Sequence, residues 1–117
     1  MSYQPGTHII ASLQATGPEL LTQHEGFRKI VEQLISTHEL QKLGEVYHDF
    51  SPAGFTAVIC LSESHISIHT WPEHGLINLD IYLSNFQRNN DGTTAAIYRS
   101  IKEYFGATIS REQFLTR

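Results

Sequence analysis

The segment from Ser62 to Tyr82 constrains the fold of this chain most, because it contains two series in which apolar residues occur at every second position, the second of which leads on to Ser84. Ile66 and Ile68 alternate with polar residues, and after a turn at Pro72 and Gly75 a second series does the same. In that second series, Ile77, Leu79, Ile81 and Leu83 oppose Asn78, Asp80, Tyr82 and Ser84. A period of two predicts strands of an antiparallel sheet with one apolar and one polar face.

Similar patterns predict the other elements. Further strands are expected over Gly6 to Ala15, Glu45 to Phe50, Phe55 to Ser62, His65 to Trp71 and Leu76 to Ser84, with a short edge strand in the tail from Ala107. An amphipathic helix is expected from Pro18 to about Leu40, with a break near Gly26, and a second from Ala95 to Phe105, with Asp91 as a candidate cap. The predicted fold class is α+β: a two-layer sandwich with both helices on the apolar face of the sheet.

Composition limits the partners. The 117 residues predict a single domain, 1–117, and a net charge of −4 without a basic cluster argues against nucleic acid. No apolar run is long enough to span a membrane, and no secretory signal is present at the start. We therefore expect neither a membrane protein nor a secreted one. The single cysteine, Cys60, favours a cytoplasmic location and is expected to be a buried, inert thiol, while Trp71 is expected to be buried.

The central segment carries the residues that could do chemistry. His65 and His69 have the spacing of a helical zinc pair, but on a strand they are about 13 Å apart, so no metal site is predicted. Ser64 lacks the context of a hydrolase nucleophile. The polar sheet face leaves two alternatives open, namely exposure to solvent or contact with a second copy of the same sheet.

Two short motifs resemble a known family. Glu63-Ser64-His65, followed by His69-Thr70-Trp71-Pro72-Glu73, is similar to the self-processing segment of the prokaryotic S-adenosylmethionine decarboxylases. Gly6-Thr7-His8 and Asp80 extend the resemblance.

The resemblance implies self-cleavage between Glu63 and Ser64, with a pyruvoyl cofactor formed from Ser64. Its carbonyl would form a Schiff base with S-adenosylmethionine and accept electrons as carbon dioxide leaves. The product would be the aminopropyl donor of spermidine biosynthesis.

The resemblance also assigns site residues. His69 would assist the elimination step of processing, and Thr56 stands where the family has a serine that also assists processing. Phe50 would stack on the adenine and Glu73 would bind the ribose, while Ser84 takes the place of the cysteine that reprotonates the product.

Ser64 and His69 would be about 17 Å apart on one strand. We therefore expect a homodimer of αββα layers with composite active sites. Ser64 and Ser84 would come from one chain, and Phe50, Thr56, His69 and Glu73 from its partner.

Ser84 departs from the family pattern, because a hydroxyl is far less acidic than a thiol. Three interpretations follow. The chain decarboxylates S-adenosylmethionine with Ser84 or a water as proton donor, it decarboxylates another amino acid such as ornithine or arginine, or it is an unprocessed, non-catalytic binding homologue.

Overall fold

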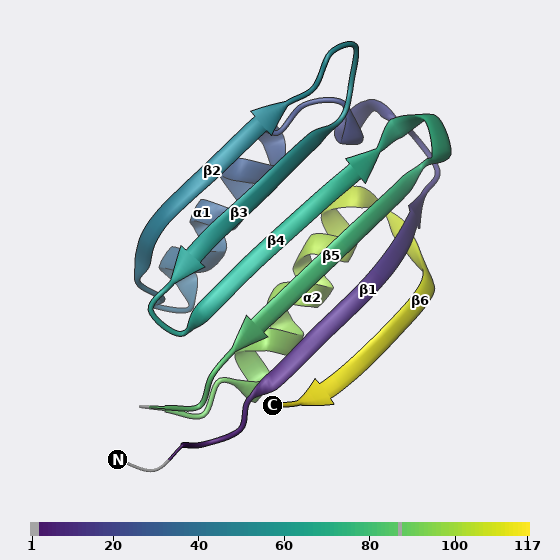
Figure 1. Ribbon diagram of the computed structural model, residues 1–117. Helices are drawn as coiled ribbons and strands as arrows, with labels where there is room; N and C mark the ends of the chain where they lie inside the picture. The colour runs from purple at the N-terminus through teal and green to yellow at the C-terminus, as the bar shows by residue number, and fades with distance from the viewer. Residues whose placement is uncertain (1–2, 87) are drawn as a thin grey trace.

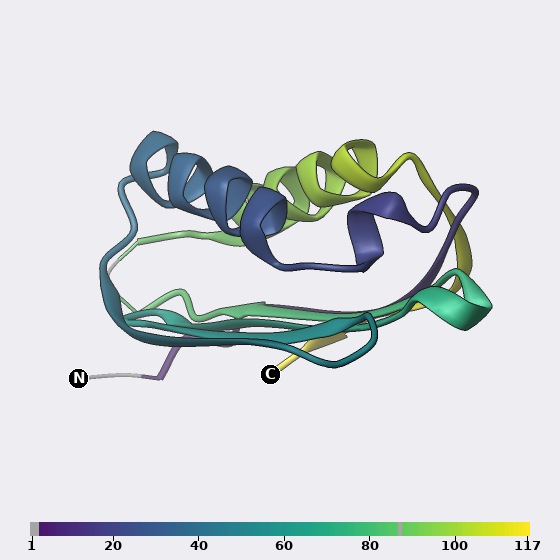
Figure 2. The ribbon, with the colours of Figure 1, turned by 90° about the horizontal axis from the view of Figure 1, so that it is seen from above.

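The computed structural model describes residues 3–86 and 88–117 as one six-stranded antiparallel sheet with two helices on one face (Figures 1 and 2). The strand order is β2-β3-β4-β5-β1-β6. The elements are β1 (Thr7–Ala15), η1 (Glu19–Leu21), α1 (Glu25–Thr37), β2 (Lys42–Asp49), β3 (Phe55–Leu61), β4 (Ser64–Trp71), η2 (Pro72–His74), β5 (Leu76–Leu83), α2 (Asp91–Phe105) and β6 (Ala107–Thr116). The predicted α+β sandwich is confirmed.

The alternation in β4 and β5 positions the core as predicted. Ile66 pairs with Ile81 and Ile68 with Leu79, and these four side chains are at most 2% exposed. They lie under the helices, where Phe27 of α1 packs against aromatic rings of β3 and α2. Burial of these apolar side chains against the helices holds the sheet in one register, because a slip of one residue would expose them all.

The first predicted helix is divided earlier than expected. A short 3-10 turn, η1, ends at Leu21, and α1 begins at Glu25 and ends at Thr37. Gly26 therefore lies inside α1 rather than at its break. A Cβ at this position would collide with the hydroxyl of Tyr104 on α2, so this glycine allows the two helices to approach closely.

Two elements near the C-terminus are longer than predicted. α2 begins at Asp91, about one turn early, and Asn90 rather than Asp91 occupies the cap position. β6 is not a short edge strand: its ten residues pair with β1 along that strand's full length. No helix within the described ranges is long and apolar enough to cross a membrane.

The outer face of the sheet, which faces away from the helices, is less polar than predicted. Cys60 and Trp71 are exposed on this face, so the prediction that they are buried is wrong. Three aliphatic side chains with exposed fractions between 39% and 64% lie there with them: Ile10, Val46 and Val58. Strand parity explains both corrections, because Cys60 alternates with Ile59 and Leu61, and Trp71 follows His69 at the same parity.

Candidate active site

The residues singled out in the sequence lie in two groups at opposite ends of β4. The turn from β3 to β4 forms what we call the cleavage end, which contains Glu63 and Ser64 and lies at the lower edge of the sheet in Figure 1. The β2–β3 hairpin and the β4–β5 turn form the pocket end at the upper edge.

Ser64 has a strained backbone conformation. β3 ends at Leu61, two turn residues follow, and Ser64 begins β4 with a φ of 148°. Residues other than glycine rarely adopt positive φ, and such a conformation costs on the order of 1–3 kcal/mol. The strained torsion is the one next to the Glu63–Ser64 peptide bond.

Several groups hold Glu63 at this turn. Its backbone carbonyl accepts a hydrogen bond from the Ser84 N–H at 2.8 Å. Its carboxylate accepts hydrogen bonds from the Ser62 hydroxyl at 2.9 Å and from the Arg88 guanidinium at 3.2 Å. Arg88 also donates to the carbonyls of residues 38 and 39 at the end of α1. The cleavage end therefore brings Glu63, Ser64 and Ser84 together.

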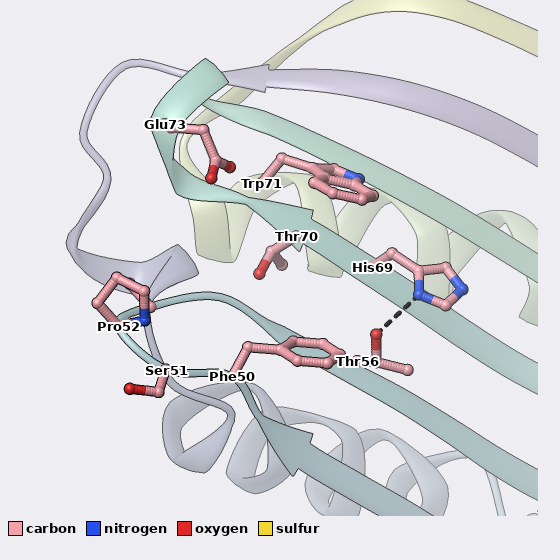
Figure 3. Close-up of a pocket in the computed structure, with 9 residues that line it drawn as sticks. Phe50, Ser51, Pro52, Thr56, His69, Thr70, Trp71 and Glu73 are labelled. Carbon is pink, nitrogen blue, oxygen red and sulfur yellow. Dashed lines mark hydrogen bonds between the residues drawn. The ribbon is translucent and has the colours of Figure 1, made fainter.

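The pocket end contains a cavity of about 490 Å³ (Figure 3). This volume lies in the range of small-molecule sites. The lining residues come from the β2–β3 hairpin, β3, β4 and η2: Phe50, Ser51, Pro52, Ala53, Thr56, His69, Thr70, Trp71 and Glu73. All four residues predicted for the partner's contribution thus line one pocket, and Trp71, expected in the core, is a lining residue that the sequence reasoning missed.

Within the pocket, Thr56 and His69 share a hydrogen bond of 2.8 Å between Oγ1 and Nδ1. They are directly opposite each other on β3 and β4, so the strand register places them together. Thr70, on the buried side of β4, accepts from the Phe55 N–H at 2.9 Å and donates to the Leu21 carbonyl at 2.8 Å. These buried bonds fix the floor of the pocket to η1.

The hairpin beside the pocket is fastened to α1 by Asp49. Burial alone would raise the pKa of this carboxyl, but the hydrogen bonds and charge of His24 outweigh burial and lower the pKa below its usual value. The His24 N–H and Nδ1 lie 2.8 and 2.9 Å from Oδ1. The ionised form of Asp49 therefore stabilises the junction of β2 and α1.

A third cluster lies on the outer face next to Ser64 and was not identified from the sequence. His8 on β1, His65 on β4 and Asp80 on β5 bring their side-chain nitrogen and oxygen atoms within 4.8 Å of one another. His8 is only 5% exposed although it is on the outer face. Only the resemblance pointed to His8 and Asp80, because β1 joins β5 through pairing of segments far apart in the sequence.

The fold and this arrangement define a two-layer α+β protein with a strained Glu-Ser turn and a separate small-molecule pocket. The comparisons identify the family. Residues 7–117 match the model of the S-adenosylmethionine decarboxylase family, and the chain belongs to it.

Similar proteins with known names support the same family. An S-adenosylmethionine decarboxylase proenzyme of Archaeoglobus fulgidus is 51% identical over 77 residues, which are 66% of this chain and 69% of the relative. A Picrophilus torridus proenzyme of the same name is 37% identical over 102 residues, 87% of this chain and 78% of the relative. A third, from a Hydrogenobaculum strain, is 44% identical over 77 residues, which cover 66% of this chain and only 58% of that relative.

A solved structure is also similar. The crystal structure of the adenosylmethionine decarboxylase from Aquifex aeolicus superposes with a TM-score of 0.79 at 29% identity, covering 99% of this chain and 91% of that one. Of the three interpretations left open by the sequence, the comparisons favour the first, because these relatives carry the name of the S-adenosylmethionine enzyme.

Proposed function

We propose that this chain cleaves itself between Glu63 and Ser64 and then decarboxylates S-adenosylmethionine, which supplies the aminopropyl donor for spermidine synthesis. Membership of the family supports the reaction. The observation that carries the proposal is the strained backbone of Ser64 at the turn. Its φ of 148° is unfavourable for a serine, and this torsion lies next to the Glu63–Ser64 peptide bond that would be rearranged.

The proposed cleavage begins when the Ser64 hydroxyl attacks the Glu63 carbonyl and converts the peptide bond to an ester. Elimination and hydrolysis then leave a pyruvoyl group at residue 64. The turn suits this chemistry, because the Ser84 N–H already donates to the Glu63 carbonyl at 2.8 Å and would stabilise negative charge that develops on its oxygen. Once formed, the pyruvoyl group supplies an electrophilic carbonyl that acts as an electron sink.

We further propose that each active site combines two protomers. Thr56 and His69 are hydrogen-bonded to each other, but His69 is about 17 Å along β4 from Ser64. A two-fold pairing of outer faces would bring the pocket end of one chain to the cleavage end of the other. The exposed apolar side chains of that face, including Val46, Val58 and Trp71, support burial against a second sheet.

In this arrangement the pocket residues bind the nucleoside. Phe50 is half exposed at the pocket mouth and would stack on the adenine, and Glu73 would accept hydrogen bonds from the ribose hydroxyls (Figure 3). His69 would assist the elimination step of processing. Ser84, beside Glu63 at the cleavage end, would supply the proton to the product carbon, directly or through water. The cytoplasmic location stays a prediction.

The intact mass of the purified protein under denaturing conditions tests this proposal, with Ser64→Ala as the control. Two fragments are expected, residues 1–63 and 64–117, the second with a pyruvoyl end, whereas Ser64→Ala stays whole. Carbon dioxide release should then be seen with S-adenosylmethionine and not with ornithine or arginine. A wild-type chain that stays as long as the control contradicts the proposal.

A further inference from the structure

A continuous series of hydrogen bonds leads from Arg117 to the Ser64 hydroxyl. Arg117 Nη1 lies 3.1 Å from His8 Nδ1, and His8 Nε2 lies 2.6 Å from Asp80 Oδ1. The same oxygen of Asp80 lies 3.0 Å from His65 Nε2, and His65 Nδ1 lies 3.2 Å from Ser64 Oγ. Five side chains from β1, β4, β5 and the end of β6 are thereby connected.

The direction of each hydrogen bond in this series follows from which groups can donate. A guanidinium only donates, so His8 must accept at Nδ1 and, when neutral, carries its proton on Nε2 and donates to Asp80. His65 likewise donates from Nε2 to the Asp80 carboxylate. The free lone pair of His65 is then on Nδ1, which faces the Ser64 hydroxyl.

The same assignment of donors and acceptors argues against a cation bound among His8, His65 and Asp80. A metal ion bound at Nε2 of His8 would require the proton on Nδ1, where it would face the N–H groups of Arg117. The cluster is therefore arranged to accept a proton from Ser64 rather than to hold an ion.

We propose that His65 is the base that takes the Ser64 hydroxyl proton during ester formation, and that Asp80 and His8 position its ring. The proposal rests on the self-cleavage proposed above. Within the described residues, His65 Nδ1 is the basic side-chain atom hydrogen-bonded to Ser64 Oγ, whereas His69 is at the far end of the strand in the same chain. Two histidines thus serve two steps: His65 acts in ester formation and His69 in elimination.

The step balances without any co-reactant. The hydroxyl proton of Ser64 moves to His65 Nδ1 as Oγ bonds to the carbonyl carbon of Glu63. The same proton then passes to the nitrogen of residue 64 as the C–N bond breaks, which yields an ester and a free amine. His65 ends in its starting state, and the Asp80 carboxylate stabilises the transient positive charge on the ring.

The experiment follows cleavage of freshly translated, full-length chain in a cell-free system. His65→Gln should slow the appearance of fragments about 100-fold or more, the usual contribution of general base catalysis. His38→Gln, a matched change at the end of α1, should cleave at the wild-type rate. Added imidazole should restore cleavage of His65→Ala, which a purely structural role of the ring would not allow.

Hydroxylamine, which splits esters but not peptide bonds, distinguishes the two histidines. His69→Ala should accumulate an ester that hydroxylamine cleaves at residue 64, whereas His65→Ala should remain resistant. Asp80→Asn should slow ester formation and Asp80→Glu should recover part of the rate, which tests the chain of bonds without altering His65.

Each outcome decides between the proposals. A His65→Gln chain that cleaves at the wild-type rate, or a His65→Ala chain that is sensitive to hydroxylamine, overturns the role of His65 and leaves the proposed function intact. Cleavage that stops on addition of a chelator overturns it too. A wild-type chain that never cleaves overturns the proposed function itself. If the His65 variants do not fold, equal rates for Asp80→Asn and wild type overturn the inference.

Discussion

The two ends of β4 are built in different ways. The residues that line the pocket come from neighbouring turns and strands, with η1 and the start of α1 as supports from outside, and Thr56 and His69 meet through a simple register pairing of β3 with β4. The cleavage end depends on groups distant in sequence, including Arg88 against Glu63 and the β1 side chain His8 near His65. The comparison teaches that one end is a compact binding unit, whereas the other is an assembled reaction centre that requires the whole fold.

The largest effect, on self-cleavage, is expected when one chain of a dimer carries the intact cleavage end and the other carries the intact pocket end. Neither Ser64→Ala nor His69→Ala should cleave when expressed alone. When the two variants are coexpressed with different tags, the His69→Ala chain should be cleaved, because its intact Ser64 would meet the His69 of a Ser64→Ala partner. Mass spectrometry under denaturing conditions measures whether the His69→Ala chain is intact or cleaved.

If the His69→Ala chain stays whole in verified mixed dimers, the two ends do not meet across the interface. The proposed composite site would then be wrong, and His69 would have to act within its own chain.

A second change acts on the cleavage end alone. Ser84→Cys should raise kcat about 10-fold or more, because a thiol with a pKa near 8.5 is a far better proton donor than a hydroxyl. Steady-state carbon dioxide release from S-adenosylmethionine measures the effect. Cys60→Ser is the control, since Cys60 is exposed and has no role in the proposed reaction. An unchanged kcat in Ser84→Cys would show that reprotonation at residue 84 does not limit the reaction.

A third change acts on the pocket end alone. Phe50→Ala should raise KM about 10-fold and leave self-cleavage unchanged, since stacking on a base contributes roughly 1–3 kcal/mol. Phe114→Ala on β6 removes a ring of similar exposure, 55% against 50%, and should leave KM unaltered. A slower cleavage in Phe50→Ala would show that the two ends are less separate than the geometry indicates.

The smallest effect concerns the anchoring of the cleavage end. Hydrogen bonds from Asn85, and then from Thr7, lower the pKa of Asp91 at the start of α2. A lowered pKa in the folded state means that the stabilisation is present above the unfolded pKa and is lost as pH falls through the folded value.

Asp91→Asn should therefore lower the free energy of unfolding at pH 7 by about 0.5 kcal/mol, and the difference should vanish as the pH falls through the lowered pKa of the folded state. Urea unfolding in a Ser64→Ala background, which avoids cleavage, measures it. A difference that persists at low pH would mean that the charge of Asp91 is not its cause.

Much of the fold could be predicted from the sequence, because β4 and β5 alternate cleanly between apolar and polar residues. The uniformly apolar run of β3 hid the same alternation, so Cys60 was wrongly predicted to be buried. The separation of Ser64 from His69 followed from strand length, whereas the other site residues were assigned by the resemblance. The hydrogen-bonded cluster of His8, His65 and Asp80 could not be derived that way, because it depends on which strand lies beside β5.

The strand order has a consequence for the proposed cleaved protein. The fragment of residues 1–63 would contribute β1, β2 and β3, and the fragment of residues 64–117 would contribute β4, β5 and β6. Because β1 lies between β5 and β6, the two polypeptides would be interleaved within a single sheet. Cleavage at the β3–β4 turn would leave every strand pairing of that sheet in place, so the two fragments should stay associated until the protein unfolds.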